Sequence, residues 1–403
     1  MPVPAVWLPN EELDLVQVRE EILTVGNPSF KELWSDGLGG GFVPKLLWEL
    51  ADKPPGQETK GVRDDNRSAV LPAHRTVVGD QEFVAAVKGC GARYDAFQPR
   101  KFSVGVLREI CHDPKVKEAL DRMEGDVPNF LVGERWWGYA PYGGQAVDNA
   151  LVSLLASLRA EGSSIAGFRI CPVVAALQLP ARFTQIASQF YWMRRYDGPY
   201  WQEVRLMPSN VRLYFHSPIT LGVDPARVLG MFHLDSLEKC GAFLRNLLGS
   251  ALAATTLLAR TLRYDAEARR YSGLDFFEVY LDKDSVVAGD GTLYFADLEG
   301  VEAFYGENPD AVKERMFGQF YQNIYEASYA VDMVARETWR SLGITASESD
   351  RRRWLLELLE QAVSSDPYLA AEREGDRMIL RVQPAVDPER TALPLVWSSG
   401  EGS

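Results

Sequence analysis

The stretch that decides the fold is YLDKDSVVAGDGTLYFADLEG, residues 280–300. Its β-branched and aromatic residues flank an Ala-Gly-Asp-Gly segment, which predicts two short strands joined by a tight turn. Such a hairpin brings Asp282 or Asp284 on one arm close to Asp297 at the end of the other. Two neighbouring carboxylates suit Mg²⁺, which takes hard oxygen ligands and leaves room for phosphate oxygens. The alternative is an ordinary surface hairpin whose acids are only solvated.

Acids at this spacing are also typical of the catalytic and metal-binding hairpin of protein kinases. The chain has 403 residues, of which 46% are hydrophobic, so it can bury a large core and form two or three lobes. Its first half is rich in strand patterns and its second half in helical ones. We therefore predict an α+β, two-lobed, protein-kinase-like fold with a strand-rich N-lobe and a helical C-lobe. The N-lobe would span residues 1–215, with an inserted segment at about 92–141, and the C-lobe residues 216–403, carrying the hairpin at 276–300.

Periodicity and turn residues place the individual elements. We expect helices over residues 11–25, 103–123 (interrupted at Pro114), 146–160, 235–249, 250–263, 308–342 and 347–364. The strand patterns are a hairpin over residues 74–88, a strand within 168–179, two strands within 201–215, and a strand over 377–382.

Composition narrows the function classes. The formal charge of −13 argues against a nucleic-acid binder that neutralises phosphates over its whole surface. The four cysteines are far apart and form no metal-ligand cluster, which disfavours structural zinc and fits a reducing cytoplasm. The four histidines are isolated, so histidine acid–base chemistry is not indicated. The N-terminus lacks a signal-peptide pattern, and the most apolar helix, residues 247–262, is too short and polar to span a membrane.

Three further motifs carry candidate nucleotide-binding groups. Lys88, at the end of a strand in VKGCG, can neutralise phosphates as a point charge, although isolated strand-end lysines usually have no such role. Arg205 and Arg212 flank a Pro-Ser turn and could converge on phosphate from adjacent strands, or be the charged edges of an exposed hairpin. Gly144 precedes a helix whose N-terminal N–H groups can bind an anion, a pattern that is common in proteins.

Together these motifs resemble the selenoprotein O family, a branch of the kinase-fold superfamily. Family members carry a Lys-Gly-x-Gly element, a glycine-led helix opening, an Arg-x-x-Pro-Ser-x-x-Arg segment, an Asp-Asn pair and a later metal-binding Asp. This chain matches them in the same order with KGCG at 88–91, GQAV at 144–147, RLMPSNVR at 205–212, Asp282 or Asp284, and Asp297. The resemblance implies a kinase-like fold that binds ATP in an inverted orientation and transfers AMP to a protein hydroxyl.

The resemblance also implies roles for the matching residues. Lys88 would contact the phosphates beside the backbone of Gly89 and Gly91, while Gly144, Arg205 and Arg212 would hold the inverted nucleotide. Asp282 would accept the proton of the substrate hydroxyl, and Asp284 and Asp297 would bind Mg²⁺ or Mn²⁺. The sequence leaves open whether Asp282 and Asp284 exchange these roles, and whether AMP or phosphate is transferred.

The family's glutamate partner for the lysine has no evident counterpart. Ser153 or Leu154 stands at that position, and Glu109 is a possible substitute. A second hypothesis is therefore a catalytically impaired pseudokinase that acts as a nucleotide-binding or protein-interaction scaffold. A third is an unrelated α+β domain with chance matches. The enzyme hypothesis requires Lys88 and Asp297 to meet across one cleft around a metal–triphosphate.

Overall fold

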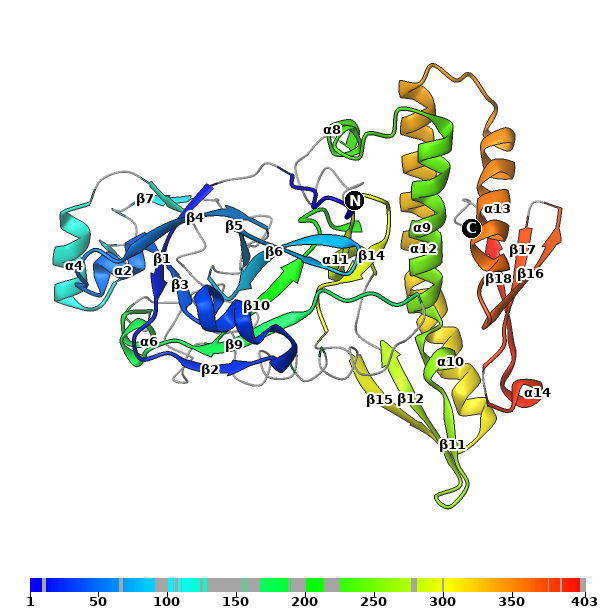
Figure 1. Ribbon diagram of the computed structural model, residues 1–403, viewed down its shortest axis with the longest axis horizontal. Coiled ribbons are helices and arrows are strands. Elements are labelled where there is room, and N and C mark those ends of the chain that lie inside the picture. Colours follow the sequence, from blue (N-terminus) through cyan, green and yellow to red (C-terminus); the bar gives the residue numbers. More distant parts are fainter. Residues whose placement is uncertain are drawn as a thin grey trace. The chain divides into compact units, whose positions relative to one another are not determined.

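The chain divides into two compact units in the computed structural model. The sheet unit comprises Pro9–Glu161 and Cys171–Met207, and the helical unit comprises Met1–Leu8, Gly162–Ile170 and Pro208–Ser403. The structure describes residues 1–8, 12–64, 68–90, 101–103, 105, 108–109, 111–123, 126–128, 154, 157, 167–187, 189, 201–213, 225–276, 281–298, 301–375, 377–384 and 386–398. The fold is mixed α+β, with a large antiparallel sheet in one unit and long helices in the other (Figure 1).

Eight of the described strands form one antiparallel sheet in the sheet unit, in the order β2-β9-β10-β6-β5-β4-β1-β3. Their bounds are β1 Glu12–Val18, β2 Leu23–Gly26, β3 Gly41–Pro44, β4 Gln57–Arg63, β5 Ser68–Val78, β6 Gln81–Lys88, β9 Val173–Gln178 and β10 Trp201–Met207. A separate pair joins β7 Lys101–Ser103 to β8 Asp126–Pro128. The shorter elements are the 3-10 turn η1 Pro28–Phe30, α1 Lys31–Leu33, the π-helical η2 Trp34–Leu38, α2 Lys45–Leu50, α4 Pro114–Asp121 and α6 Ala181–Ala187.

The hairpin expected at 74–88 is confirmed as the β5–β6 pair. Gly79 supplies the turn with a φ of +63°, which glycine adopts without steric cost. The register then pairs Val78 with Gln81 and Ser68 with Lys88, at the two ends of the ladder. Because β6 is central in the sheet, all but one of its side chains are buried, and Lys88 ends the strand inside the protein.

The helix expected over residues 11–25 is wrong, because this segment forms β1 and β2. Leu13 and Leu15 are buried while Glu12 and Asp14 are exposed, which is the two-residue alternation of a strand. The same residues also fit a helical spacing, and the β-branched Val16 and Val18 favour the sheet once β3 and β4 offer partners on both sides. Within the segment 103–123 the described residues 105, 108 and 109 are helical, as expected, and a separate helix, α4, begins at Pro114.

Helices dominate the helical unit. They are α8 Pro225–Gly230, α9 Leu237–Thr255, α10 Leu257–Thr261, α11 Leu281–Asp284, α12 Pro309–Ser341, α13 Glu348–Ser364 and α14 Pro388–Thr391. The long helices α12 and α13 confirm the expected helical segments, whereas the break expected between residues 249 and 250 falls at Thr256, between α9 and α10. Their starts are set locally, since the side chains of Ser236, Asn308 and Ser347 each accept a hydrogen bond from the first turn. The helices α9 and α12 run side by side (Figure 1) and share a core of leucine, alanine and valine.

Three small antiparallel sheets complete the described part of the helical unit. One contains β11 Arg263–Asp265, β12 Arg270–Phe276 and β15 Val301–Gly306; the second pairs β13 Ser285–Val287 with β14 Leu293–Phe295; the third contains β16 Leu369–Glu374, β17 Arg377–Val382 and β18 Leu393–Ser398. The strand expected at 377–382 is confirmed, whereas β11, β12, β15, β16 and β18 were not expected. No helix among the described residues has the length and apolar character needed to cross a membrane.

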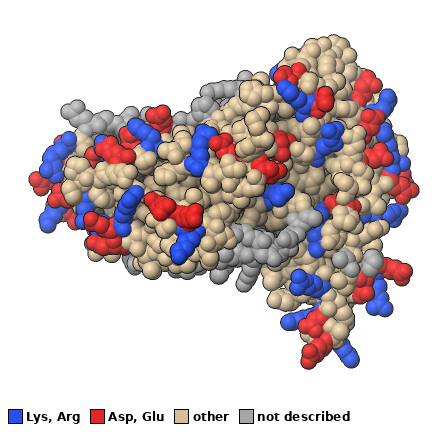
Figure 2. Space-filling model, viewed as in Figure 1, with Lys and Arg blue, Asp and Glu red and all other residues tan. Residues whose placement is uncertain are grey.

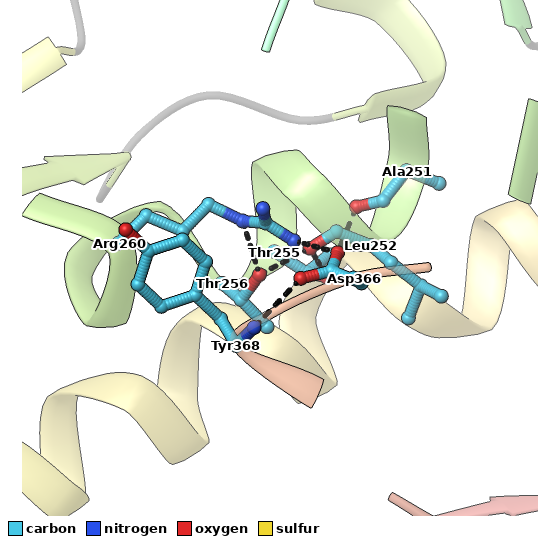
Figure 3. Close-up of polar contacts among 7 residues, drawn as sticks. All are labelled: Ala251, Leu252, Thr255, Thr256, Arg260, Asp366 and Tyr368. Carbon is cyan, nitrogen blue, oxygen red and sulfur yellow. Dashed lines mark hydrogen bonds and ion pairs between the residues drawn. The ribbon is translucent and has the colours of Figure 1, made fainter. Parts of the chain in front are cut away.

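A buried ion pair ties the third sheet to the end of α10 (Figure 3). The Arg260 side chain is 2% exposed and bonds a carboxylate oxygen of Asp366. Its Nε also donates to the Thr256 hydroxyl over 2.9 Å, and its guanidinium lies 5.2 Å from the centre of the Tyr368 ring. Asp366 in turn accepts the backbone N–H of Tyr368 at 2.9 Å, so one carboxylate both neutralises the arginine and starts the turn into β16.

Candidate functional site

The hairpin predicted from residues 280–300 is present, and it brings two of the candidate acids together. β13 and β14 pair Ser285 with Phe295, so Asp284, one residue before this pair, and Asp297, two residues after it, lie at the same end of the hairpin. The backbone carbonyl of Asp284 accepts the N–H groups of Ala296, at 2.8 Å, and of Asp297, at 3.3 Å. Asp284 is buried, at 6% exposure, and Asp297 is partly exposed. The expected proximity of these two residues is therefore confirmed at the level of the backbone.

The first arm of this hairpin differs from the prediction at its start. Asp282 and Asp284 lie in α11, a single helical turn, rather than in an extended strand. The turn is held in place from α12, because the Asn323 side chain accepts the N–H of Leu281 at 3.0 Å. The side chain of Asp282 lies outside the described residues. Asp282 as the base therefore stays a prediction.

The hairpin is also fixed along both of its edges. On one side the N–H of Val287 donates to the carbonyl of Val211 at 2.8 Å, and Arg212 forms an isolated antiparallel bridge with Val286. On the other side Phe295 donates to the carbonyl of Arg169 at 3.0 Å. The turn is anchored to α9, where the Ser250 hydroxyl accepts the N–H of Leu293 at 2.9 Å. The backbone of Arg212 is thereby placed beside Val286 of β13, the arm that begins after Asp284.

This placement of Arg212 corrects the expectation of two strands folding back around residues 208–210. β10 ends at Met207, and the chain then continues beside the N-terminal segment instead of returning along β10. Asn210 holds that course, since its amide donates to the carbonyl of Leu8 at 3.0 Å and accepts the N–H of Leu8 at 2.6 Å. Arg205 and Arg212 consequently belong to different units, and their joint action on one phosphate stays a prediction.

In the sheet unit, Lys88 lies directly opposite Glu203 in the β6–β10 ladder. Residues paired in this way project from the same face of a sheet, as do residues two apart in one strand such as Glu203 and Arg205. An ion pair of 2.6 Å joins Arg205 to Glu203. All three residues are buried, with exposures of 4% for Lys88, 0% for Glu203 and 3% for Arg205. We call Lys88, Glu203 and Arg205 the buried charge group.

Glu203 is the functional candidate that the sequence reasoning missed. Glu109, the expected substitute partner of Lys88, is exposed. A usable signal existed, because Glu203 precedes Arg205 by two residues in a strand pattern and must share its face. Buried charges are costly unless they are paired, so the ion pair with Arg205 accounts for the burial of Glu203.

The glycines of the proposed nucleotide site are only partly described. Gly89 follows β6 with a φ of +99°, and its carbonyl accepts the Gln202 amide at 3.1 Å. A side chain would be strained at that φ, so glycine is required for the turn. Gly91, Gly144 and most of the predicted helix 146–160 lie outside the described residues, as does most of the inserted segment at about 92–141.

In the described part of the chain, few residues support metal binding or thiol chemistry. There, no group of three or more His, Cys, Asp or Glu side chains could hold a metal ion. Mg²⁺ binding by Asp284 and Asp297 stays a prediction; two carboxylates would suit this ion because it keeps several waters and phosphate oxygens as ligands. All four cysteines are buried and free, and burial raises the pKa of the Cys240 thiol to about 11. That thiol is consequently no nucleophile at neutral pH.

Acidic and basic side chains are interspersed on the face shown in Figure 2. Among the described residues on that face, no continuous basic stripe is visible. Binding to a polyanion over this face is not favoured by such a distribution.

No protein-family model matches the chain, and no curated protein matches it. The resemblance to the selenoprotein O family accordingly rests on the short motifs alone and stays a prediction.

Proposed function

We propose that this protein is an ATP- and Mg²⁺-dependent transferase of kinase-like fold that passes AMP, or phosphate, from ATP to a protein hydroxyl. The observation that carries the proposal is the shared end of the β13–β14 hairpin. There the carbonyl of Asp284 accepts the backbone N–H of Asp297, and Arg212 forms an isolated antiparallel bridge with Val286 of β13. Two acids and a cation fixed by backbone pairing form a preorganised setting for a metal and a phosphate.

In this proposal each group has a role that fits its chemistry. Asp284 and Asp297 hold the divalent cation, whose charge offsets that of the phosphate oxygens. Arg212 supplies donors to a phosphate, and Asp282 accepts the proton that the attacking hydroxyl releases. A role for Lys88 at the phosphates is supported by its KGCG motif alone.

One observation favours the alternative function, a nucleotide-binding or protein-interaction scaffold. Lys88 and Arg205 are 4% and 3% exposed, and Arg205 is already paired with Glu203. A buried charge group of this kind can serve to fix the register of the sheet rather than to contact a nucleotide. The two functions differ in whether ATP is consumed.

The test is self-labelling with ATP that carries its label at either the α or the γ phosphate, in the presence of Mg²⁺ or Mn²⁺. Label from the α position identifies AMP transfer, and label from the γ position identifies phosphate transfer. Absence of both, together with a melting temperature raised by Mg-ATP, identifies the scaffold. Absence of both labels and of any thermal shift would refute both functions.

The variant Asp297→Asn tests the assignment of the metal-binding acid. We expect labelling to fall by about a hundredfold or more, because a bound metal contributes several kcal/mol of charge stabilisation. The matched control is Glu307→Gln, which removes one exposed carboxylate from the same unit and should leave the rate unchanged. An undiminished rate in Asp297→Asn, with normal folding, removes Asp297 from the site.

A further inference from the structure

The helical unit contains a cavity where the first turns of α12 pack on β12 and β15. Its volume is about 500 Å³, within the range typical of small-molecule sites. Phe304 of β15 and Phe317 of α12 supply apolar walls, and Gly318 and Gln319 continue the α12 side. The cavity involves none of the residues assigned to the proposed transferase site.

Gln319 is the unusual residue of this cavity. It is 3% exposed, and neither the nitrogen nor the oxygen of its side-chain amide makes a hydrogen bond to another described residue. Leaving a buried amide unpaired costs about 1–3 kcal/mol per group, so native structures rarely keep one without a use. The backbone carbonyl of Gln319, by contrast, has a partner, because it accepts a hydrogen bond from the side-chain amide of Asn323 at 3.2 Å.

The charges around the cavity restrict what could bind there. Arg315 donates to the buried carboxylate of Asp275, so these two residues largely neutralise each other. Glu314 adds an exposed negative charge at the rim. A phosphate or carboxylate ligand would meet repulsion from Glu314, whereas a neutral ring would not.

We propose that this cavity binds a neutral, planar heteroaromatic molecule of the nucleobase or nucleoside class. A glutamine amide presents one donor beside one acceptor, which is the pattern that pairs with the edge of a base such as adenine. Phe304 and Phe317 line the cavity, and aromatic side chains are the groups against which such a ring packs. The site is independent of the proposed transferase function and goes beyond it.

The experiment is a titration of the full chain with adenosine, followed by ligand-observed NMR in the presence of saturating Mg-ATP. The ATP keeps adenosine out of the proposed catalytic site. We expect saturable binding, weakened about tenfold or more for N6,N6-dimethyladenosine, which lacks the N6 donor, because each lost hydrogen bond to the amide weakens binding several-fold. The variant Gln319→Leu should lose this preference and bind adenosine about tenfold or more weakly.

Two further variants guard against a trivial loss of folding. Gly318 lies inside α12, and a side chain added there meets no atom within 4 Å, so Gly318→Leu should fold and fill the cavity. Gly249 of α9 has equally open surroundings, and Gly249→Leu is therefore the matched control. Loss of adenosine binding in Gly318→Leu but not in Gly249→Leu supports the site. Binding that persists in Gly318→Leu and Gln319→Leu, or no binding of adenosine at millimolar concentration, overturns it.

Discussion

Removing the Asp366 carboxylate tests how much the buried ion pair stabilises the helical unit. In Asp366→Ala the Arg260 guanidinium, with its side chain 2% exposed, would keep its charge without its acidic partner (Figure 3). Breaking a buried pair in this way costs about 3–5 kcal/mol. The Asp366 side chain is itself 13% exposed, so water can partly replace it, and we expect a loss near the lower limit, about 3 kcal/mol.

The assay must report on the helical unit alone, because a chain of two units need not unfold in one step. Hydrogen exchange at increasing urea concentration, followed by mass spectrometry, gives the free energy of opening for peptides from α13 and β16. The matched control is Glu372→Ala, which removes the acid of the exposed pair with Arg381 in the same sheet, where both side chains are more than half exposed, at 57% and 53%. We expect that control to change the opening free energy by less than about 1 kcal/mol.

A double variant distinguishes the loss of the ion pair from the cost of leaving one buried charge without its partner. Arg260→Met with Asp366→Leu removes both charges and keeps most of the volume, so it should recover much of the stability lost in Asp366→Ala. The reasoning is refuted if Asp366→Ala costs no more than the Glu372→Ala control. It is also refuted if the double variant is less stable than Asp366→Ala.

Two other predictions concern the hairpin turn and a buried thiol. A methyl group at Gly291, where φ is +91°, would lie 2.2 Å from the carbonyl oxygen of Phe243, whereas at Gly343, where φ is +67°, it meets no atom within 4 Å. In urea unfolding we expect Gly343→Ala to cost about 1–2 kcal/mol and Gly291→Ala clearly more; equal losses would contradict the close approach of the turn to α9. Burial raises the pKa of the Cys240 thiol from 9.0 to about 11. As the pH rises, the thiol therefore loses its proton in the unfolded chain before it does so in the folded chain. The buried thiol's contribution to the free energy of unfolding is then complete below pH 9 and declines between pH 9 and 11. Urea midpoints at pH 8 and pH 10.5 should therefore differ less in Cys240→Ala than in the unchanged protein, and identical differences would count against this linkage.

Local sequence patterns were enough to predict the helices and hairpins whose cap and turn residues lie within or next to the element itself. The caps Ser236, Asn308 and Ser347 stand immediately before the helices that they start, and periodicity carries α9, α12 and α13 from there. The β5–β6 and β13–β14 hairpins were predictable for a related reason. Their turns contain glycines at positive φ, at Gly79 and Gly291, which fold each strand back on its sequence neighbour.

Predictions failed where two local states were close in energy. The segment at residues 11–25 fits both a helical and a strand spacing, and only the partners β3 and β4 decide for the strand. Similarly, α11 is a single turn that the side chain of Asn323, on α12, holds in place. A turn this short has little stability of its own, so its sequence carries no clear signal.

The sequence by itself thus determined the mixed α+β class, the long helices and the approach of either Asp282 or Asp284 to Asp297, because each depends on residues close together in the chain. Only the tertiary structure decided that Glu203 faces Lys88, that Arg212 lies beside β13, and that Gln319 lines a cavity. Those placements depend on the register between strands and on the packing of a helix against a sheet. Both follow from burial summed over distant segments, which no local pattern encodes.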